Sequence, residues 1–292
     1  MKKITYRKLD AFSNRQSNGN PAACLYLESE KDLTVEQMQN IAKEHKGFVS
    51  EVIYCWQIEE SLYRLRYYSS ECEVEFCGHG TIACIYDLIC NNEELRKLEG
   101  ITIRTNKGDL KVYNELDTLD AVFITAPEPQ YLEILVSLTD IINNLNILEK
   151  TIDNSFPIMT IDAGLRTLIV PIVDMKNLVR IQPSESKLKD FCLKNDIDII
   201  LVFTTEVTDS NNKMRTRVFA PKFGYLEDPA TGSGNSAFGY YMAKHGLWDG
   251  NPISIEQNAE IDNYNIVKLK MMENQVLFGG NAIVKINGYY LF

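Results

Sequence analysis

The chain has 292 residues, 45% of them hydrophobic and 24% charged, which is enough for two globular domains that each bury a core. A formal net charge of -10 without any Lys/Arg-rich run argues against a nucleic-acid-binding surface, and no apolar run is long enough to span a membrane. Seven cysteines without a CxxC pair indicate neither a disulfide framework nor a structural zinc site, so we expect a cytoplasmic protein without a metal.

The first half of the chain consists mainly of short strand-like runs, β-branched or aromatic, that end at Gly, Asn, Ser or Asp. These runs cover residues 3–12, 22–28, 49–58, 63–70, 100–106 and 108–116. One helix is predicted over residues 33–47, where Thr34 and Gln37 form a capping box and Gly47 ends the helix.

The second half repeats this pattern of short strands. They are predicted at residues 121–127, 156–164, 165–174, 198–207, 214–221, 252–258, 264–271 and 281–288. Helices are expected near residues 131–147 and 184–195. We expect an N-terminal lobe, residues 1–117 joined by the C-terminal strand at about 281–292, and a C-terminal lobe, residues 118–280.

An internal repeat is the most informative feature of the sequence. The stretches "RLRYYSSECEVEFCGHGTIACIYDL", from Arg64, and "RTRVFAPKFGYLEDPATGSGNSAFGYYM", from Arg215, follow the same order of elements. Each has an Arg-x-Arg strand, an acidic loop, a Gly-x-Gly turn and an unusually apolar helix. The helices run from 81 to about 90 and from 235 to about 245. Because a helix that is apolar on nearly all sides is typically buried, we expect an α+β fold in which each half curls a sheet around one central helix.

The Gly-x-Gly turns lie at the starts of these helices, in "CGHG" at 77–80 and "TGSG" at 231–234. The first turn of a helix offers unpaired N–H groups and a partial positive charge, which suit a carboxylate or an oxyanion. A single Gly-x-Gly is usually an ordinary turn, but two at equivalent places favour a ligand site. His79, between the two glycines, is expected to be neutral at such a helix end; alternatively it only hydrogen-bonds the backbone of the turn.

Two carboxylates are further candidates for the site. Glu51 shares a strand face with apolar residues, so it lies either in water at the end of the sheet or buried with a raised pKa, as an acid or base. Asp228 lies just ahead of the second Gly-x-Gly turn and before a proline, where an aspartate often serves only as a cap or turn residue. Glu227 beside it is expected to do no more than form the same turn.

Four motifs together resemble the phenazine-biosynthesis F (PhzF-like) isomerases, which have the diaminopimelate epimerase fold. In chain order they are "DAFSNRQSNGNPAACLYL", "SEVIY", "CGHGTIA" and "FAPKFGYLEDPATGSGNSA", and the resemblance covers residues 8 to 245 approximately. It implies an α+β protein with two pseudo-symmetric lobes, each a β-barrel-like mixed sheet around a central helix. It also implies a homodimer, an active site in the cleft between the lobes and no cofactor.

The same resemblance assigns roles to residues of this chain. Glu51, His79 and Asp228 are the expected catalytic residues, with Glu51 as the acid/base group. The expected substrate-binding residues are Asn20, Gly78, Gly80, Thr81, Gly232, Ser233 and Gly234. The predicted function is a cofactor-independent isomerase that moves a proton on a small carboxylated substrate, either amino acid-like or cyclic and unsaturated.

Two alternatives remain at this stage. A racemase of this fold uses one cysteine per lobe; Cys77 occupies the first place but Thr231 stands at the second, and Cys192 lies in a charged helix, although a mixed Cys77/Glu51 pair stays open. A non-catalytic ligand-binding or dimeric partner protein is the other alternative. It gains support from residues 256–264, which keep Gln257 but lack the Gly that usually follows it in the family.

Overall fold

The computed structural model describes residues 2–133 and 135–291, which form two compact units. Unit 1 comprises Met1–Thr125 and Gly279–Phe292, and unit 2 comprises Ala126–Phe278. The chain thus leaves unit 1 one strand later than the expected residue 117. The reason is that strand β8 (Ala121–Thr125) pairs antiparallel with the preceding strand β7 (Gly108–Glu115) and completes the sheet of unit 1.

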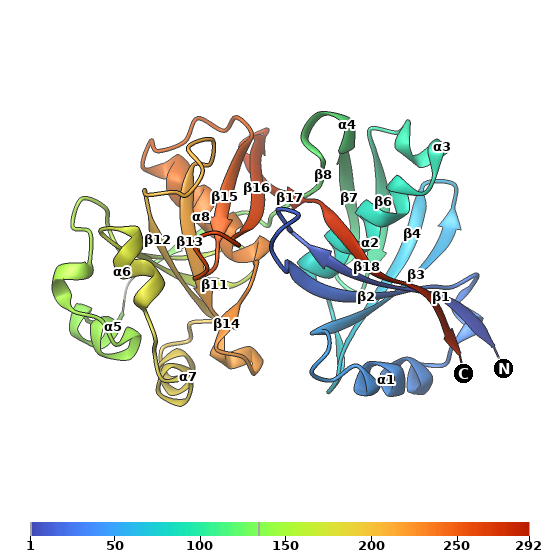
Figure 1. The fold of residues 1–292 in the computed structure, drawn as a ribbon, viewed down its shortest axis with the longest axis horizontal. Coiled ribbons are helices and arrows are strands. Elements are labelled where there is room, and N and C mark those ends of the chain that lie inside the picture. Colours follow the sequence, from blue (N-terminus) through green and yellow to red (C-terminus); the bar gives the residue numbers. More distant parts are fainter. Residues whose placement is uncertain (1, 134, 292) are drawn as a thin grey trace. The chain divides into compact units, whose positions relative to one another are not determined.

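Unit 1 is a strongly curved sheet with helices (Figure 1). Its other strands are β1 (Lys3–Ala11), β2 (Asn20–Tyr26), β3 (Glu51–Glu59), β4 (Leu62–Ser69), β5 (Glu73–Val74), β6 (Gly100–Thr105) and β18 (Ala282–Leu291). Its helices are η1 (Glu30–Asp32), α1 (Val35–Glu44), α2 (Gly78–Cys90), α3 (Glu93–Arg96) and α4 (Leu116–Leu119). Helix α1 begins at the predicted capping box, with Thr34 and Gln37 each bonding the backbone of the other.

Unit 2 is built in the same way. Its strands are β9 (Gln130–Leu132), β10 (Met159–Asp162), β11 (Arg166–Pro171), β12 (Ile199–Thr204), β13 (Met214–Phe219), β14 (Glu227–Asp228), β15 (Ile253–Gln257), β16 (Asn265–Met272) and β17 (Gln275–Gly280), which runs on into unit 1. Its helices are α5 (Leu138–Leu145), η2 (Glu149–Thr151), α6 (Met175–Arg180), α7 (Glu185–Lys194), η3 (Pro221–Phe223) and α8 (Gly232–Lys244).

Strand pairing shows that the repeat seen in the sequence is a repeat of topology. In unit 1, β1–β2 and β3–β4 are antiparallel, while β2–β3 and β4–β6 are parallel. In unit 2, β10–β11 and β12–β13 are antiparallel, while β11–β12 and β13–β15 are parallel. The short strands β5 and β14 pair with equivalent positions of β4 and β13. Hence α2 and α8 occupy equivalent places, each after a two-residue strand.

Each unit surrounds one of these two helices with its strands, as the apolar sequences predict (Figure 1). From Gly80 to Ile85 every residue of α2 is buried, and the helix contacts β1, β2, β3, β8 and β18. From Gly234 to Met242 every residue of α8 is buried. A second apolar cluster in each unit lies under the outer helices, α1 in unit 1 and α5 to α7 in unit 2. The central helices are therefore rigidly held, and so are their N-termini.

The differences between prediction and structure include one helix and one strand. The helix expected near 131–147 is only the eight-residue α5, because Gln130–Leu132 pair with β10 as a strand; residue 134 lies outside the described residues. Strand β17 was not predicted, since its two final glycines indicate a turn. A Cβ atom at Gly279 would lie 2.3 Å from the carbonyl oxygen of Val122, so glycine here permits close strand contact. Within the described residues, no helix is both long and apolar enough to cross a membrane.

Candidate active site

Three chemically reactive side chains meet at the N-terminus of α2 in unit 1. Glu51 Oε2 lies 3.3 Å from His79 Nε2, and the Cys77 thiol donates to the same oxygen at 3.6 Å. Cys77 Sγ is 3.4 Å from His79 Nδ1 and 3.8 Å from Nε2. We call these three residues the α2 cluster. It brings together two of the three predicted catalytic residues and adds Cys77.

The local sequence explains why the three groups meet. Glu51 is the first residue of β3, where the strand enters the sheet, so its side chain is 18% exposed although the next residues on its strand face, Ile53 and Cys55, are apolar and buried. Cys77 is the N-cap of α2, and its sulfur accepts the N–H of Gly80 at 3.3 Å. A Cβ atom on Gly80 would lie 2.7 Å from Ile53 Cδ1, so glycine lets the helix start approach β3. The Gly-x-Gly turn thus brings Cys77 and His79 beside Glu51.

His79 is a neutral imidazole at pH 7, as predicted, but mainly because of burial. Its side chain is only 13% exposed, and this burial lowers the pKa of His79 to about 4. A hydrogen bond to the backbone carbonyl of Pro21 raises the pKa and offsets part of the effect. Because a neutral ring has one N–H, a ring that donates to Pro21 keeps a lone pair on its other nitrogen. The contact with Glu51 is therefore a polar contact and no ion pair.

The sulfur of Cys77 lies over the imidazole ring and not along the in-plane lone-pair direction of either ring nitrogen. Its distances to Nδ1 and Nε2 are nearly equal, whereas a sulfur in line with one nitrogen would be much farther from the other. An in-line contact is what a Cys–His nucleophile pair needs. The cluster is thus better suited to moving protons at Glu51 than to forming a thiolate nucleophile.

The equivalent helix start in unit 2 carries a different set of groups. Asp228 is buried, and its Oδ2 accepts the hydroxyl of Thr231 at 2.6 Å. Gln257 Oε1 accepts the backbone N–H of Thr231 at 3.0 Å, and its Nε2 donates to the Asp228 carbonyl at 2.8 Å. The Gln257 amide also accepts from Asn235 Nδ2 at 2.7 Å. Gln257 and Thr231 therefore fix Asp228 at the start of α8.

The remaining predicted residues divide into accessible and buried groups. Gly78 and Ser233, in the first turns of α2 and α8, are partly exposed. Asn20, the first residue of β2, is buried, and so are Gly80, Gly232 and Gly234. Thr81 is fully buried; its hydroxyl donates to the Cys77 carbonyl at 2.8 Å and contacts the Tyr67 hydroxyl at 2.7 Å. The side chain of Thr81 therefore stabilises the helix start.

The Arg-x-Arg strands and acidic loops of the repeat form matched ion pairs that the sequence analysis did not predict. Arg66 binds Glu73 through Nε and Nη2, at 2.8 and 2.7 Å. At the equivalent place in unit 2, Arg217 binds Glu227 through the same two nitrogens, at 2.9 and 2.8 Å. Glu227 thus has a role beyond its turn. Each pair joins a long strand to the two-residue strand that leads to the central helix.

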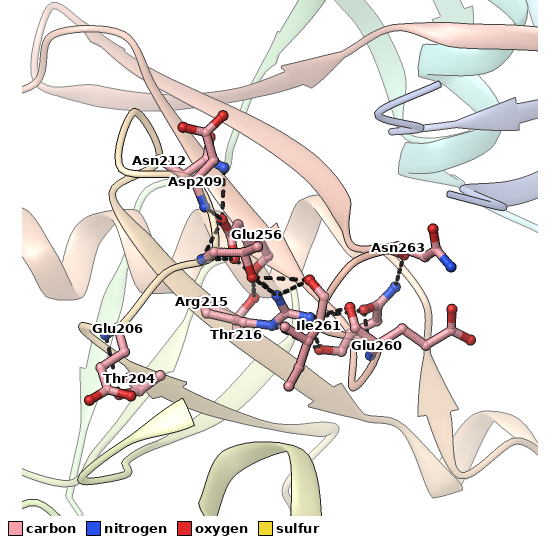
Figure 2. A network of polar contacts seen from close by, with 12 residues as sticks. Thr204, Glu206, Asp209, Asn212, Arg215, Thr216, Glu256, Glu260, Ile261 and Asn263 are labelled. Carbon is pink, nitrogen blue, oxygen red and sulfur yellow. Dashed lines mark hydrogen bonds and ion pairs between the residues drawn. The ribbon is translucent and has the colours of Figure 1, made fainter. Parts of the chain in front are cut away.

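Arg215, the other arginine of the second motif, supports the end of β15 (Figure 2). It is fully buried with Glu256, and its Nη1 lies 3.0 Å from Glu256 Oε2. Its Nη2 also donates to the carbonyls of Asn258 and Glu260, at 3.1 and 2.6 Å. Asn258 has a φ of 115°, a backbone conformation that favours glycine. Arg215 thereby holds the segment that directly follows Gln257, with Asn258 in a backbone conformation that favours glycine.

Comparisons with known proteins agree with this fold. The profile of the PhzC-PhzF family, described as phenazine biosynthesis-like protein, matches residues 9–288. The chain is 28% identical over 290 residues to the uncharacterized isomerase YfhB of Bacillus subtilis. The aligned region covers 99% of this chain and 96% of YfhB. The crystal structure of a Bacillus anthracis phenazine biosynthesis protein of the PhzF family matches with a TM-score of 0.82 and 27% identity, covering 100% of both chains.

A more distant match supports the fold alone. The crystal structure of a probable proline racemase from Agrobacterium radiobacter covers 99% of this chain and 92% of its own, with a TM-score of 0.62 and 10% identity. These matches confirm the predicted α+β fold and the resemblance to PhzF-like isomerases. The chain belongs to the phenazine biosynthesis-like (PhzC-PhzF) family and is an isomerase of that family.

Proposed function

We propose that this protein catalyses a cofactor-independent proton shift on a small carboxylated substrate, with Glu51 as the acid/base group. The observation that carries the proposal is the α2 cluster, in which the Glu51 carboxylate lies 3.3 Å from a neutral, largely buried imidazole. A carboxylate held in this way can take a proton from an activated carbon and return it to another position. His79 provides a hydrogen-bonding group for the enol or enamine that forms in between.

Within each unit, the start of the central helix offers groups that can bind a carboxylate. The first turns of α2 and α8 present N–H groups and a partial positive charge, which favour a carboxylate. Gly78 and Ser233 are the partly exposed residues of these turns. In unit 2, Asp228 is fixed by Thr231 and Gln257, and we assign it to substrate orientation, as the family resemblance implies.

The geometry of the α2 cluster argues against Cys77 and Glu51 as the two bases of a racemase. A racemase removes a proton from one face of a carbon and adds it to the opposite face. Cys77 Sγ and Glu51 Oε2 are 3.6 Å apart, so both approach a substrate from the same side. In unit 2, Cys192 is fully buried within an apolar cluster and is unsuited to act as a base. A shift in which one group removes and returns the proton on one face fits this arrangement better.

The test is solvent deuterium uptake by NMR, with small unsaturated and α-amino carboxylic acids in heavy water. We expect uptake with wild-type protein and a loss of at least about 100-fold in Glu51→Gln, since acid/base catalysis typically contributes ~10²–10⁴-fold. Glu59→Gln is the matched control, because Glu59 is an exposed residue at the other end of β3. Equal uptake in wild type and Glu51→Gln would remove Glu51 from the mechanism.

A further inference from the structure

We propose that Glu51, Cys77 and His79 bind one Zn²⁺ ion at the N-terminus of α2. A carboxylate oxygen, a sulfur and an imidazole nitrogen, one from each residue, all lie within 4.8 Å of one another. The sequence did not predict this site, because Glu51 is 26 residues before Cys77 and no CxxC or His-x-x-x-His spacing exists. Pairing of β3 with its neighbours and the start of α2 bring the three residues together.

The distances match those of a zinc ion with three protein ligands. Tetrahedral zinc, with bonds of about 2.1 Å to nitrogen and oxygen and about 2.3 Å to sulfur, separates nitrogen from oxygen by about 3.4 Å and sulfur from either by about 3.6 Å. The observed separations are 3.3 Å for Nε2–Oε2, 3.6 Å for Sγ–Oε2 and 3.8 Å for Sγ–Nε2. Cys77 Sγ lies over the imidazole and not in line with Nε2, so the His79 ring or the Cys77 side chain must rotate before one ion can contact all three atoms.

The surroundings of His79 also suit a metal ligand. Imidazoles that bind a metal usually donate their other N–H to a carboxylate or a backbone carbonyl, which fixes the ring. The hydrogen bond to the Pro21 carbonyl fulfils this role. The side chains of Glu51 and His79 are 18% and 13% exposed, so solvent reaches one side of the triangle. A water molecule can then complete the tetrahedron, as in zinc sites with an open position.

The ligand types select zinc and similar transition metals over magnesium or calcium. Thiolate and imidazole are preferred by Zn²⁺, whereas Mg²⁺ and Ca²⁺ prefer oxygen ligands. Binding releases the thiol proton of Cys77 to solvent, and the Cys77 thiolate and Glu51 carboxylate then balance the two positive charges of the ion. The helix end opposes a cation with roughly half an elementary charge, which is small against these two full charges.

Zinc at this position would occupy the carboxylate that the proposed isomerase needs, so the ion acts as an inhibitor. This consequence rests on the proposed function, but zinc binding itself does not. The binding experiment is therefore done without substrate. The zinc titration tests binding independently of whether Glu51 moves a proton. Deuterium uptake in the metal-free protein tests the proposed function independently of whether zinc binds.

The experiment is calorimetric titration of the metal-free full chain with ZnCl₂, in a background with Cys72→Ser and Cys90→Ser. These substitutions remove the two exposed thiols, which would otherwise bind zinc non-specifically. We expect one zinc per chain in this background. Further substitution by Cys77→Ser or Glu51→Gln should weaken zinc binding by at least about tenfold, because removing even a residue that only hydrogen-bonds a metal ligand costs about that much affinity. MgCl₂ is the cation control and should give no binding.

A second measurement identifies the ligands directly. Co²⁺ in place of Zn²⁺ should give a thiolate-to-cobalt charge-transfer band in the background protein and none after Cys77→Ser. Circular dichroism of each variant checks that it is folded, and two independent ligand variants prevent one unfolded variant from deciding the result. Absence of binding in the folded background, or one zinc bound equally well after Cys77→Ser and Glu51→Gln, would overturn the proposal.

Discussion

Gln257 shows how much one buried amide contributes to the candidate site. Its side chain is inaccessible to solvent and bonds Thr231, Asn235 and the carbonyl of Asp228. The family resemblance drew attention to Gln257, but its partners lie 22 to 29 residues away and no local pattern indicates them. Glu51 and His79 were identified because each stands inside a motif. The contacts of Gln257 with Asp228 and Thr231 could not be predicted, since they depend on strand register.

Replacing Gln257 by Leu should destabilise unit 2 by roughly 3 kcal/mol, because several buried polar groups lose their partner at about 1–3 kcal/mol each. The side-chain volume is nearly kept, so a cavity is a minor part of the loss. Urea unfolding measures the change in free energy. Gln57→Leu is the control, since Gln57 is exposed and should change stability by no more than about 0.5 kcal/mol. A loss as small as that of the control would contradict the role given to Gln257.

At the scale of elements, the predictions succeeded where composition alone decides the outcome. Helices α2 and α8 were predicted because sequences that are apolar on nearly all sides can only be buried. Strands β5 and β14 were not predicted, because two residues carry no periodic pattern. They are instead fixed by pairing with β4 and β13 and by the ion pairs Arg66–Glu73 and Arg217–Glu227. These elements depend on tertiary contacts.

The Arg66–Glu73 pair should make the attachment of β5 depend on pH. Hydrogen bonds from Arg66, and then from Asn106, lower the pKa of Glu73 below its usual 4.5, against the opposing effect of burial. A carboxyl group with a lowered pKa in the folded state adds stability above pH 4.5, and that stability is lost as pH falls further. The contribution of such a partly exposed pair is about 1 kcal/mol.

Urea unfolding of wild type and Glu73→Gln from neutral pH to well below 4.5 measures this contribution. The two proteins should differ by about 1 kcal/mol at neutral pH, and the difference should shrink as the medium becomes acidic. Glu75→Gln controls for loss of a negative charge on the same loop, since the Glu75 side chain is 73% exposed. A difference between wild type and Glu73→Gln that stays constant with pH would rule out the ion pair as its cause.

At the scale of the whole molecule, the chain is a duplication whose two copies have diverged in their buried charges. Arg64 and Arg215 are equivalent, each two residues before the arginine of the matched ion pair. Arg215 lies opposite Glu256 of β15 and is completely buried with it. Arg64 lies opposite Arg104 of β6 and donates to the Arg104 carbonyl at 2.9 Å. Of these two equivalent arginines, Arg215 is the one that forms a fully buried ion pair, and this pair supports the segment after Gln257.

This difference predicts opposite sensitivities to the same substitution. Arg215→Met should destabilise unit 2 by about 3–5 kcal/mol, because it leaves Glu256 as an uncompensated buried charge. Arg64→Met, the equivalent change in unit 1, should cost no more than about 1 kcal/mol, as expected for an arginine without a buried carboxylate partner. The two units can be followed separately, because Trp56 lies in unit 1 and Trp248 in unit 2 and the chain has 2 tryptophans.

Trp56→Phe and Trp248→Phe backgrounds therefore each report on one unit by tryptophan fluorescence during urea unfolding. Arg215→Met should shift the transition of Trp248 to lower urea, and Arg64→Met should leave the transition of Trp56 nearly unchanged. The reference for each comparison is the same background without the arginine substitution, since replacing a tryptophan that is only 7% exposed itself affects stability. Equal shifts in the two units would mean that the duplicated arginines have kept the same structural role, and that the Arg215–Glu256 pair adds nothing specific to unit 2.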